Sequence, residues 1–496
     1  MSVHKTSALL LFAAACIPSV VALAASTYQH ALANYANVFV DPNYVIGKNY
    51  SNTTFDAQQT ILRWANDSAQ GGPWSVTTKQ YLAPSGDKHD YTSFAVYSWA
   101  DCSHVGNTTQ LTPEQIWKTC PYVTIDGKLN PEADAIPNAD DFDSLANAVL
   151  YNGLAWGITG SSTYATLVAT YIKAWFLDAD TFMNPNLNYA QMQRGPGQNG
   201  THTGVLDLKA MAKIASGILV LRDGKAQEWT SDIDKGFVGW INNYIGWLHT
   251  SPLALKEKSS TNNHGSYYFT QLAALQVMVG DIAGAKGTIN EYLGGTLILG
   301  LGINGFTVLM TASQPLESSR TRPFHYRAYN LAAMITTARI ADYISLSPSV
   351  WTKTTSAGST ITSALSFSMS HLGDATSDTE KQELYPLVAS VAAGVGDANN
   401  TYSKFLSHND GSRYITDPTF FWSQPLSDLG YVAASNQTRS VTTSAAHGVS
   451  TGTSGGKKGG GNGSTKEGTN GSEHSASVRV GMSSVVGVVV TAALLL

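Results

Sequence analysis

Residues 163–176, TYATLVATYIKAWF, carry the pattern that decides the fold. The large apolar side chains of this stretch recur at three- and four-residue spacing and share one helix face: Tyr164, Leu167, Val168, Tyr171, Ile172, Trp175 and Phe176. A stripe of this kind is typical of an amphipathic helix packed against a core. The stretch therefore predicts a core-facing helix.

The same spacing recurs on both sides of this stretch, whereas the alternating pattern of strands is scarce. We expect helices over residues 142–157, 163–176, 207–221, 231–248, 267–279, 283–293, 327–344 and 380–395. Many helices of similar length, separated by loops with Pro, Gly or Asn, predict an all-α fold of helical hairpins around one core.

The two ends of the chain have the composition of processing signals. Lys5, an apolar run over 8–15 and small residues at 22–25 predict a secretory signal peptide over residues 1–25. Residues 441–472 form a Ser/Gly-rich linker that cannot bury enough apolar surface to fold. Residues 473–496 end in an uncharged apolar tail, which after small residues at 470–472 predicts a glycosylphosphatidylinositol (GPI) attachment signal. The alternative is a transmembrane helix, although Gly and Ser dilute the tail.

A domain over residues 26–440 remains, and its composition is typical of a secreted glycoprotein. Cys16 leaves with the signal peptide, so Cys102 and Cys120 are expected to form one loop-closing disulfide. Glycosylation acceptors occur at Asn49, Asn52, Asn66, Asn107, Asn199, Asn399, Asn436, Asn462 and Asn470. The net charge of -5 and the lack of basic runs argue against nucleic acid as a partner. We expect a monomer that meets membranes through a lipid anchor alone.

Residues 261–268, TNNHGSYY, place an amide and an imidazole at the entrance of an expected helix. Asn263 can donate to a sugar carboxylate, and His264 can act as a base for an acidic α-proton, as β-elimination on a uronic acid requires. The positive end of the helix macrodipole favours a neutral imidazole. The alternative interpretation is that Asn262 or Ser266 caps the helix, with the histidine at the surface and the tyrosines as packing.

Residues 85–91, SGDKHDY, and the following Tyr97-Ser98-Trp99 interleave charges with aromatic rings. Lys88 and His89 could approach sugar carboxylates, while Tyr91 and Trp99 could stack on pyranose faces. A solvated loop held by ring packing is the alternative.

Residues 183–191, MNPNLNYAQ, offer Asn188 and Tyr189 to sugar hydroxyls, although repeated amides also stabilise turns.

Residues 314–330, QPLESSRTRPFHYRAYN, concentrate arginines, a histidine and tyrosines at the entrance of another expected helix. Each guanidinium must be paired or solvated, so Arg320 and Arg322 indicate a fixed-charge site for an anion beside His325, Tyr326 and Tyr329. The alternative is a solvated basic helix entrance.

In this order, and spread over about residues 80–345, the motifs SGDKHDY, MNPNLNYAQ, NNHGSYY and SQPLESSRTRPFHYRAYNL resemble the alginate lyase domain family of polysaccharide lyases. The resemblance implies an (α/α) toroid, an incomplete barrel of helical hairpins with a substrate cleft lined by loops. It also implies β-elimination of a uronate polymer such as alginate or glucuronan, and Gly265 is more similar to the glucuronan branch.

Residue by residue, the resemblance assigns Asn263 to the carboxylate-contacting amide and His264 to the catalytic histidine. Arg320 or Arg322 corresponds to the catalytic arginine, and Tyr326, with Tyr329 in reserve, to the catalytic tyrosine. The residues expected to bind substrate are Lys88, His89, Tyr91, Trp99, Asn188, Tyr189, Asn262, Tyr267, His325 and Tyr329.

No His, Asp or Glu group has the sequence spacing of metal ligands, so we expect no required metal or other cofactor.

Two further functions are weighed against the lyase. A glycoside hydrolase would need two carboxyl groups facing one cleft, for which Asp90, Asp101 and Glu317 are candidates. A non-catalytic cell-wall protein would bind the polymer without turnover.

Overall fold

The computed structural model describes residues 38–423, except residues 49, 108–109, 126–127, 295, 299–300, 304–310 and 356–357. The expected signal peptide, linker and GPI tail lie outside the described residues, as do four of the glycosylation acceptors: Asn49, Asn436, Asn462 and Asn470. Within the part of the chain that the structure describes, no helix is long and apolar enough to cross a membrane.

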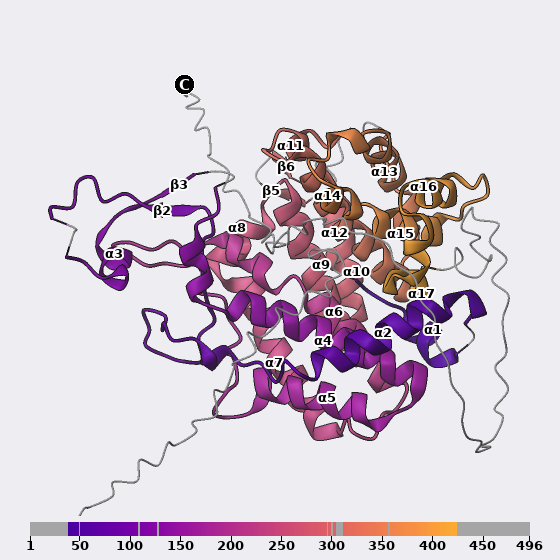
Figure 1. Cartoon of the computed structure of the whole chain (residues 1–496), viewed down its shortest axis with the longest axis horizontal. Helices are drawn as coiled ribbons and strands as arrows, with labels where there is room; N and C mark the ends of the chain where they lie inside the picture. The colour runs from indigo at the N-terminus through magenta and orange to yellow at the C-terminus, as the bar shows by residue number, and fades with distance from the viewer. Residues whose placement is uncertain are drawn as a thin grey trace, which may run out of the picture.

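Helices dominate the described chain, as the sequence predicts (Figure 1). They are α1 (Pro42–Gly47), α2 (Phe55–Ser68), α3 (Pro113–Thr119), α4 (Asn138–Thr159), α5 (Ser162–Ile172), α6 (Met211–Asp223), α7 (Ser231–Thr250), α8 (Pro252–Lys258), α9 (Asn263–Met278), α10 (Ile282–Gly294), α11 (Pro315–Ser318), α12 (Pro323–Tyr343), α13 (Ile361–Ser370), α14 (Asp378–Gln382), α15 (Tyr385–Val395), α16 (Thr401–Asn409) and α17 (Pro418–Trp422).

The strands are short and form small two-stranded sheets. They are β1 (Thr92–Phe94), β2 (Ser98–Ala100), β3 (Tyr122–Thr124), β4 (Tyr189–Met192), β5 (Thr296–Ile298) and β6 (Leu301–Ile303). The pair β1–β4 is parallel, whereas β2–β3 and β5–β6 are antiparallel. A 3₁₀ helix, η5 (His202–Leu208), precedes α6 and carries a residue of the site described below.

The helices pack as a ring of hairpins, which confirms the all-α toroid. Inner helices contact one another in chain order, from α4 to α6, α9, α12 and α15, and α17 and α2 connect α15 back to α4. Outer helices cover them: α5 packs on α4, α10 on α9, α13 on α12 and α16 on α15. Residues far apart in sequence are therefore brought to the ends of neighbouring inner helices.

Inner and outer helices differ in burial. Residues 163–176 lie in α5 and in the π-helical turn that follows it, η4 (Lys173–Leu177). They bury Val168, Tyr171, Ile172, Trp175 and Phe176, as predicted. Inner helix α9 is instead buried at every position, polar ones included. An inner helix has neighbours on all sides, so its polar side chains must find partners inside the protein.

Several expected helix boundaries were wrong. The helices expected at 267–279 and 327–344 begin earlier, at Asn263 and Pro323, because an Asn262 cap and a proline in the first turn start them there. The helix expected at 380–395 is two helices, α14 and α15, and that at 207–221 is the end of η5 followed by α6.

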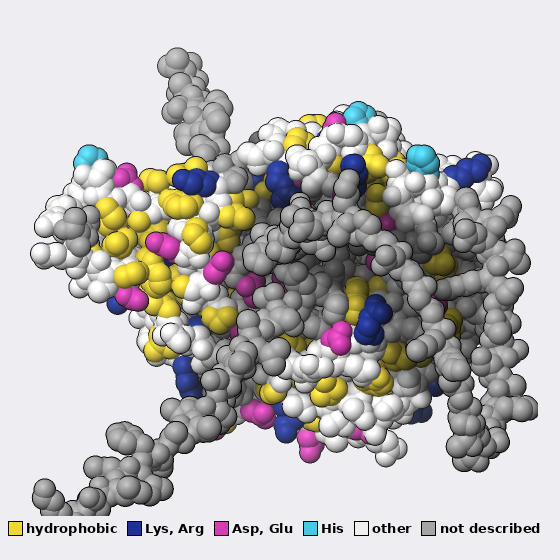
Figure 2. Space-filling model, in the orientation of Figure 1, with side chains coloured by type: hydrophobic (Ala, Val, Ile, Leu, Met, Phe, Trp, Pro, Cys, Tyr) yellow, Lys and Arg dark blue, Asp and Glu magenta, His cyan; other side chains and the backbone are white. Residues whose placement is uncertain are grey.

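An arm carrying β2, α3 and β3 extends from the helical body (Figure 1). The predicted disulfide between Cys102 and Cys120 closes this arm. Its base is held by Arg194, whose guanidinium lies 4.3 Å from the Phe94 ring and 4.5 Å from the Tyr122 ring. Hydrophobic side chains are gathered on the face of the arm shown in Figure 2. Val123, in β3, and the following Ile125 and Leu129 are exposed.

Candidate active site

The Asn-His motif occupies the first turn of α9. Asn262 has extended backbone angles and caps the helix, its side chain accepting from the backbone N–H of His264 at 3.2 Å. The cap and the candidate catalytic residues are thus neighbours, so both interpretations of this motif apply at once. Gly265 permits the close approach of the preceding turn, because a Cβ there would lie 2.1 Å from the backbone oxygen of Ser260.

Asn263 is held by a carboxylate from α11. Its backbone N–H donates to Glu317 Oε1 at 2.7 Å and its side-chain amide donates to Glu317 Oε2 at 2.8 Å. Burial raises the pKa of Glu317, against the hydrogen bonds from Asn263 and the charges of Arg320 and His264. The Asn263 side-chain oxygen is buried and has no hydrogen-bond partner among the described residues. This amide therefore has a fixed orientation.

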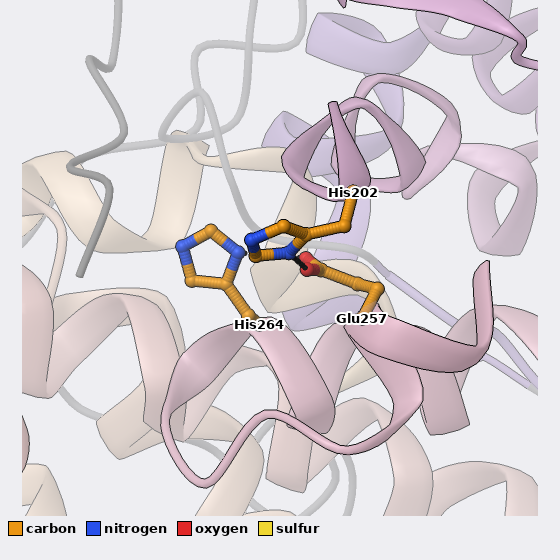
Figure 3. Close-up of side chains that lie close together, drawn as sticks. All are labelled: His202, Glu257 and His264. Carbon is orange, nitrogen blue, oxygen red and sulfur yellow. Dashed lines mark hydrogen bonds and ion pairs between the residues drawn. The ribbon is translucent and has the colours of Figure 1, made fainter. Parts of the chain in front are cut away.

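His264 shares a buried carboxylate with a second histidine (Figure 3). Glu257, on α8, places Oε1 2.7 Å from His264 Nδ1 and Oε2 2.5 Å from His202 Nδ1, on η5. The Glu257 side chain is fully buried, while 4% of the His264 side chain and 24% of the His202 side chain are exposed. One carboxylate thus supports two imidazoles that lie nearer the solvent.

Glu257 is held as a carboxylate by its partners. Burial acts to raise its pKa, but the charge of His264, the hydrogen bonds from both histidines and the charge of His202 outweigh burial and lower that pKa. The same carboxylate faces Nδ1 of His264, a partner that the sequence motif does not include.

Arg320 and Tyr326 lie against each other at the entrance of α12. The guanidinium carbon of Arg320 is 4.3 Å from the centre of the Tyr326 ring, a cation–π contact. Arg320 Nη2 is buried and has no hydrogen-bond partner among the described residues. A guanidinium with an unused donor suits an anionic ligand. The charge of Arg320 also acts to lower the pKa of Glu317, so Arg320 belongs to the same group as Asn263 and His264.

Tyr329 lies deeper than Tyr326. Its ring centre is 4.4 Å from that of Tyr267, whose hydroxyl donates to the Tyr329 backbone oxygen at 2.9 Å. Both residues are fully buried, and burial raises the pKa of each well above the ordinary tyrosine value. Tyr267 and Tyr329 therefore pack the wall of the site.

Arg322 and His325 turn toward α14 and its C-terminal end. Arg322 Nε donates to Glu380 Oε1 at 2.9 Å, and His325 Nδ1 is 2.9 Å from Glu383 Oε2. Burial, aided by the charges of Arg322 and Arg320, lowers the pKa of His325 to about 3. Burial raises the pKa of Glu383 to about 9, so this histidine and carboxyl are both neutral near pH 7.

The loop motif at 85–91 packs on residues that precede β4. The Asn184 amide donates to Asp87 at 2.9 Å and to Asp90 at 2.8 Å, and the His89 ring stacks on Phe182 with Nδ1 2.6 Å from the Phe182 backbone oxygen. Lys88 is exposed. These contacts make His89 part of the loop structure and leave Lys88 accessible.

The remaining expected binding residues are spread over several elements. Asn188 accepts from Trp247 Nε1 at 2.9 Å, and half-buried Tyr189 begins β4. Trp99, on the arm, donates to the Lys128 backbone oxygen at 2.9 Å, and its ring lies 4.3 Å from Lys128 Nζ. The described contacts do not bring Trp99 together with Asn263 and His264.

Tyr91 helps to position η5. The Asp207 side chain accepts from Tyr91 at 3.2 Å, from Ser93 at 2.5 Å and from Gln191 Nε2 at 2.9 Å. These bonds tie η5 to residues of β1 and β4 and to Tyr91, beside β1. Tyr91 is 1% exposed, so it supports the element that carries His202 from within the core.

Sequence reasoning missed His202 and Glu257. The structure places His202, Glu257 and His264 together, with candidate ligand atoms within 4.8 Å of one another, although sequence spacing indicated no such group. Two imidazoles and a carboxylate suit zinc. However, zinc ligands at tetrahedral angles stand about 3.3 Å apart, whereas the contacts here are 2.7 and 2.5 Å. Such contacts suit hydrogen bonds better than shared coordination.

The carboxyl groups considered for a hydrolase each have local partners. Asp90 accepts from Ser85 at 2.7 Å and from Asn184, Asp101 accepts from Ser103 at 2.7 Å, and Glu317 holds Asn263. A hydrolase needs two carboxyl groups on opposite sides of one bond. Among the described residues, no hydrogen bond joins any two of these three carboxyl groups to a common partner.

A helical toroid with an amide, a histidine, an arginine and a tyrosine at neighbouring helix entrances defines the class of a polysaccharide lyase. The sequence profile of the family described as Alginate lyase matches residues 75–377, more than half of the chain. The chain belongs to the alginate lyase family, and it is a polysaccharide lyase.

A solved structure supports this membership. An alginate lyase from Bacteroides ovatus, in a crystal structure at 1.60 Å resolution, is 26% identical in sequence. The match covers 78% of this chain and 97% of that chain, with a TM-score of 0.65. No curated protein sequence matches the chain significantly.

Proposed function

We propose that this lyase cleaves an alginate- or glucuronan-like uronate polymer by β-elimination, and that Asn263, His264, Arg320 and Tyr326 carry the reaction. The observation that supports the proposal most directly is the convergence of these residues around Glu317. Asn263 is bonded to Glu317, Arg320 and His264 act on its charge, and Arg320 lies on the Tyr326 ring.

Neutralisation of the sugar carboxylate is the first requirement. Removing the C5 proton spreads negative charge onto the C6 carboxylate, so donors and fixed positive charge at that group lower the barrier. Arg320 has an unused buried donor, and Asn263 has a second amide hydrogen beside the one given to Glu317. Arg322, which binds Glu380, is assigned to the structure of the helix entrance instead.

The proton transfers follow. As a base removes the C5 proton, the electron pair of that bond forms the C4=C5 double bond, the C4–O4 bond breaks, and O4 takes a proton from an acid. His264 and Tyr326 are the proton-carrying groups of the site. The products are a chain with an unsaturated uronate at its non-reducing end and a second chain with a new reducing end, where O4 stays on C1 as a hydroxyl.

The test is a panel of alginate, polymannuronate, polyguluronate, glucuronan and a neutral glucan. We expect ultraviolet absorbance from the new C4=C5 double bond with at least one uronate polymer and none with the glucan. New reducing ends without that absorbance would indicate hydrolysis, and saturable binding without any product would indicate a non-catalytic binding protein. Either result would overturn the proposal.

We also propose that the chain is secreted, glycosylated and held at the cell surface by a GPI anchor, as a monomer. The terminal sequence patterns, the acceptor asparagines and the disulfide of the arm support this proposal. Release of the protein from intact cells by a phosphatidylinositol-specific phospholipase C tests the anchor. Treatment with an endoglycosidase, followed by light scattering of the released protein, tests the glycans and the monomer.

A further inference from the structure

We propose that Glu257 is a positioning residue that holds both His264 and His202 with the proton on Nδ1, so that Nε2 of each ring is an acceptor for the substrate. In this arrangement His264 Nε2 takes the C5 proton, and His202 Nε2 accepts a hydrogen bond from a sugar hydroxyl. The inference rests on the proposed function and assigns two residues that the sequence motifs do not include.

The geometry of the three side chains carries the first step. Each oxygen of one carboxylate faces one imidazole nitrogen, with separations of 2.7 Å to His264 and 2.5 Å to His202. A carboxylate can only accept, so both nitrogens that face it must carry protons. In a neutral imidazole the other nitrogen, Nε2, is then the acceptor.

Burial carries the second step. Glu257 is fully buried, and an isolated carboxylate would be strongly disfavoured there. Two charge-assisted hydrogen bonds therefore compensate a single charge, and removing either ring leaves half of that compensation. When His264 accepts a proton at Nε2, the imidazolium forms against a carboxylate already in place, so the developing charge is balanced within the site.

The third step rests on how far each of the three side chains is exposed and on which elements carry them. The three side chains form a gradient from the buried carboxylate, through His264 with 4% of its side chain exposed, to His202 with 24% exposed. The two ring centres are 6.2 Å apart, and the side chains come from different elements, η5 and α9 (Figure 3). Within the described residues, the hydrogen bonds of these two rings are those that Nδ1 makes with Glu257. An approaching sugar can therefore meet both acceptors.

A measurement on the free enzyme tests the tautomers without any turnover. Protein labelled with ¹⁵N-histidine is studied by long-range ¹H–¹⁵N correlation, and each ring is assigned from single His→Ala variants. We expect the patterns of His264 and His202 to show the proton on Nδ1. Finding the proton on Nε2 of either ring overturns the inference. Because no substrate is present, this result stands apart from any failure of the uronate panel.

Glu257→Gln makes a sharper prediction. The amide offers one acceptor and one donor group, so it can face only one Nδ1–H and must donate to the other ring. We expect one ring to switch to the Nε2–H form. A switch of His264 lowers kcat for the uronate polymer about 100-fold with KM nearly unchanged, whereas a switch of His202 raises KM more than it lowers kcat. Thermal unfolding checks that the variant folds. A folded variant with both tautomers and the rate unchanged contradicts the inference.

Two further variants separate the roles of the histidines. For His202→Ala we expect KM to rise more than kcat falls, because this ring binds a hydroxyl and does not take the C5 proton. Glu291→Gln is the matched control, since its carboxylate pairs with Lys258 at 2.7 Å on the side of α10, and its kinetics should equal wild type. An equal loss in Glu291→Gln and Glu257→Gln would indicate a merely structural effect.

Zinc titration addresses the competing use of the same donors. We expect wild type to retain its rate after dialysis against a chelator and to bind zinc no more tightly than His202→Ala. Stoichiometric zinc uptake that all three residues require, together with loss of activity on chelation, would make the group a metal site and overturn the inference.

Discussion

Asn263 is bound twice by Glu317: its backbone N–H and its side-chain amide donate to the two oxygens of one buried carboxylate, at 2.7 and 2.8 Å. The bond joins the first residue of α9 to α11, which precedes α12. It therefore sets the distance between the helix entrances that carry His264 and Tyr326.

Glu317→Gln should disturb this junction. A glutamine can accept one of the two N–H groups, but its own amide then faces the other, which leaves a buried donor unpaired at a cost of about 1–3 kcal/mol. We expect the free energy of unfolding to fall by that amount and kcat to fall with it. Denaturant unfolding and initial rates measure both, and a variant with wild-type kinetics contradicts the role of this bond.

The two arginines at the entrance of α12 should respond differently to substitution. Arg320→Ala removes the free donor beside Tyr326, so we expect a lower kcat/KM with little loss of stability. Arg322→Ala removes a partner of Glu380, whose side chain is 1% exposed, so we expect a loss of stability of about 1–3 kcal/mol with smaller kinetic effects. Kinetics and unfolding of the pair check this, and the reverse pattern would make Arg322 the arginine of the site.

Tyr326 and Tyr329 form a second matched pair. Tyr326→Phe should lower kcat by about 10²- to 10⁴-fold, as expected when a proton-transferring group is removed. Tyr329→Phe should keep most of the turnover, because Tyr329 is fully buried and its phenol resists ionisation. Rates of double-bond formation and calorimetric binding to the inactive variants decide between them. A more damaging Tyr329→Phe reverses the assignment.

Gly265 should tolerate no side chain. A Cβ would lie 2.1 Å from the Ser260 backbone oxygen, so Gly265→Ala must displace the turn that leads to Asn262 and His264. We expect a loss of about 1–3 kcal/mol of stability and most of the activity. Gly287→Ala, on α10 with no atom within 4 Å of its Cβ position, is the control and should stabilise the protein by about 0.5–1 kcal/mol. Equal thermal shifts in the two variants would count against this account.

Glu383 should make stability depend on pH. Its pKa is about 9 in the folded protein against an ordinary 4.5, so between these values the folded state keeps a proton that the unfolded state releases, and stability falls as pH rises. Above pH 7 the partner His325 is neutral in both states, since its pKa moves down from 6.5. The fall should reach about 1.4 kcal/mol per pH unit.

Glu383→Gln removes this titration. We expect the variant to gain stability relative to wild type as pH is raised from 7 to 8.5, measured by urea unfolding at each pH. Asp378→Asn, at the start of α14 with 87% of its side chain exposed, is the control and should show a pH-independent difference. A constant difference between wild type and Glu383→Gln would sink the prediction.

Local patterns in the sequence were enough to predict the helices, the disulfide between Cys102 and Cys120 and the Asn263-His264 motif. The spacing of apolar residues predicts both a helix and its buried face wherever one side of the helix meets solvent, as in α5. The family was implied by the resemblance of four ordered motifs. The first residues of α9 and α12 were predicted less accurately, because a cap and a first-turn proline decide where these helices begin.

The sequence by itself determined a helical member of the alginate lyase family and the residue types of its candidate site, because periodicity and ordered motifs are properties of neighbouring residues. Only the tertiary structure decided which side chains share a partner. Glu257 and His202 are 55 positions apart and meet at 2.5 Å, and Glu317 reaches Asn263 across 54 positions. Such contacts depend on how inner helices pack around the ring, which no local pattern records.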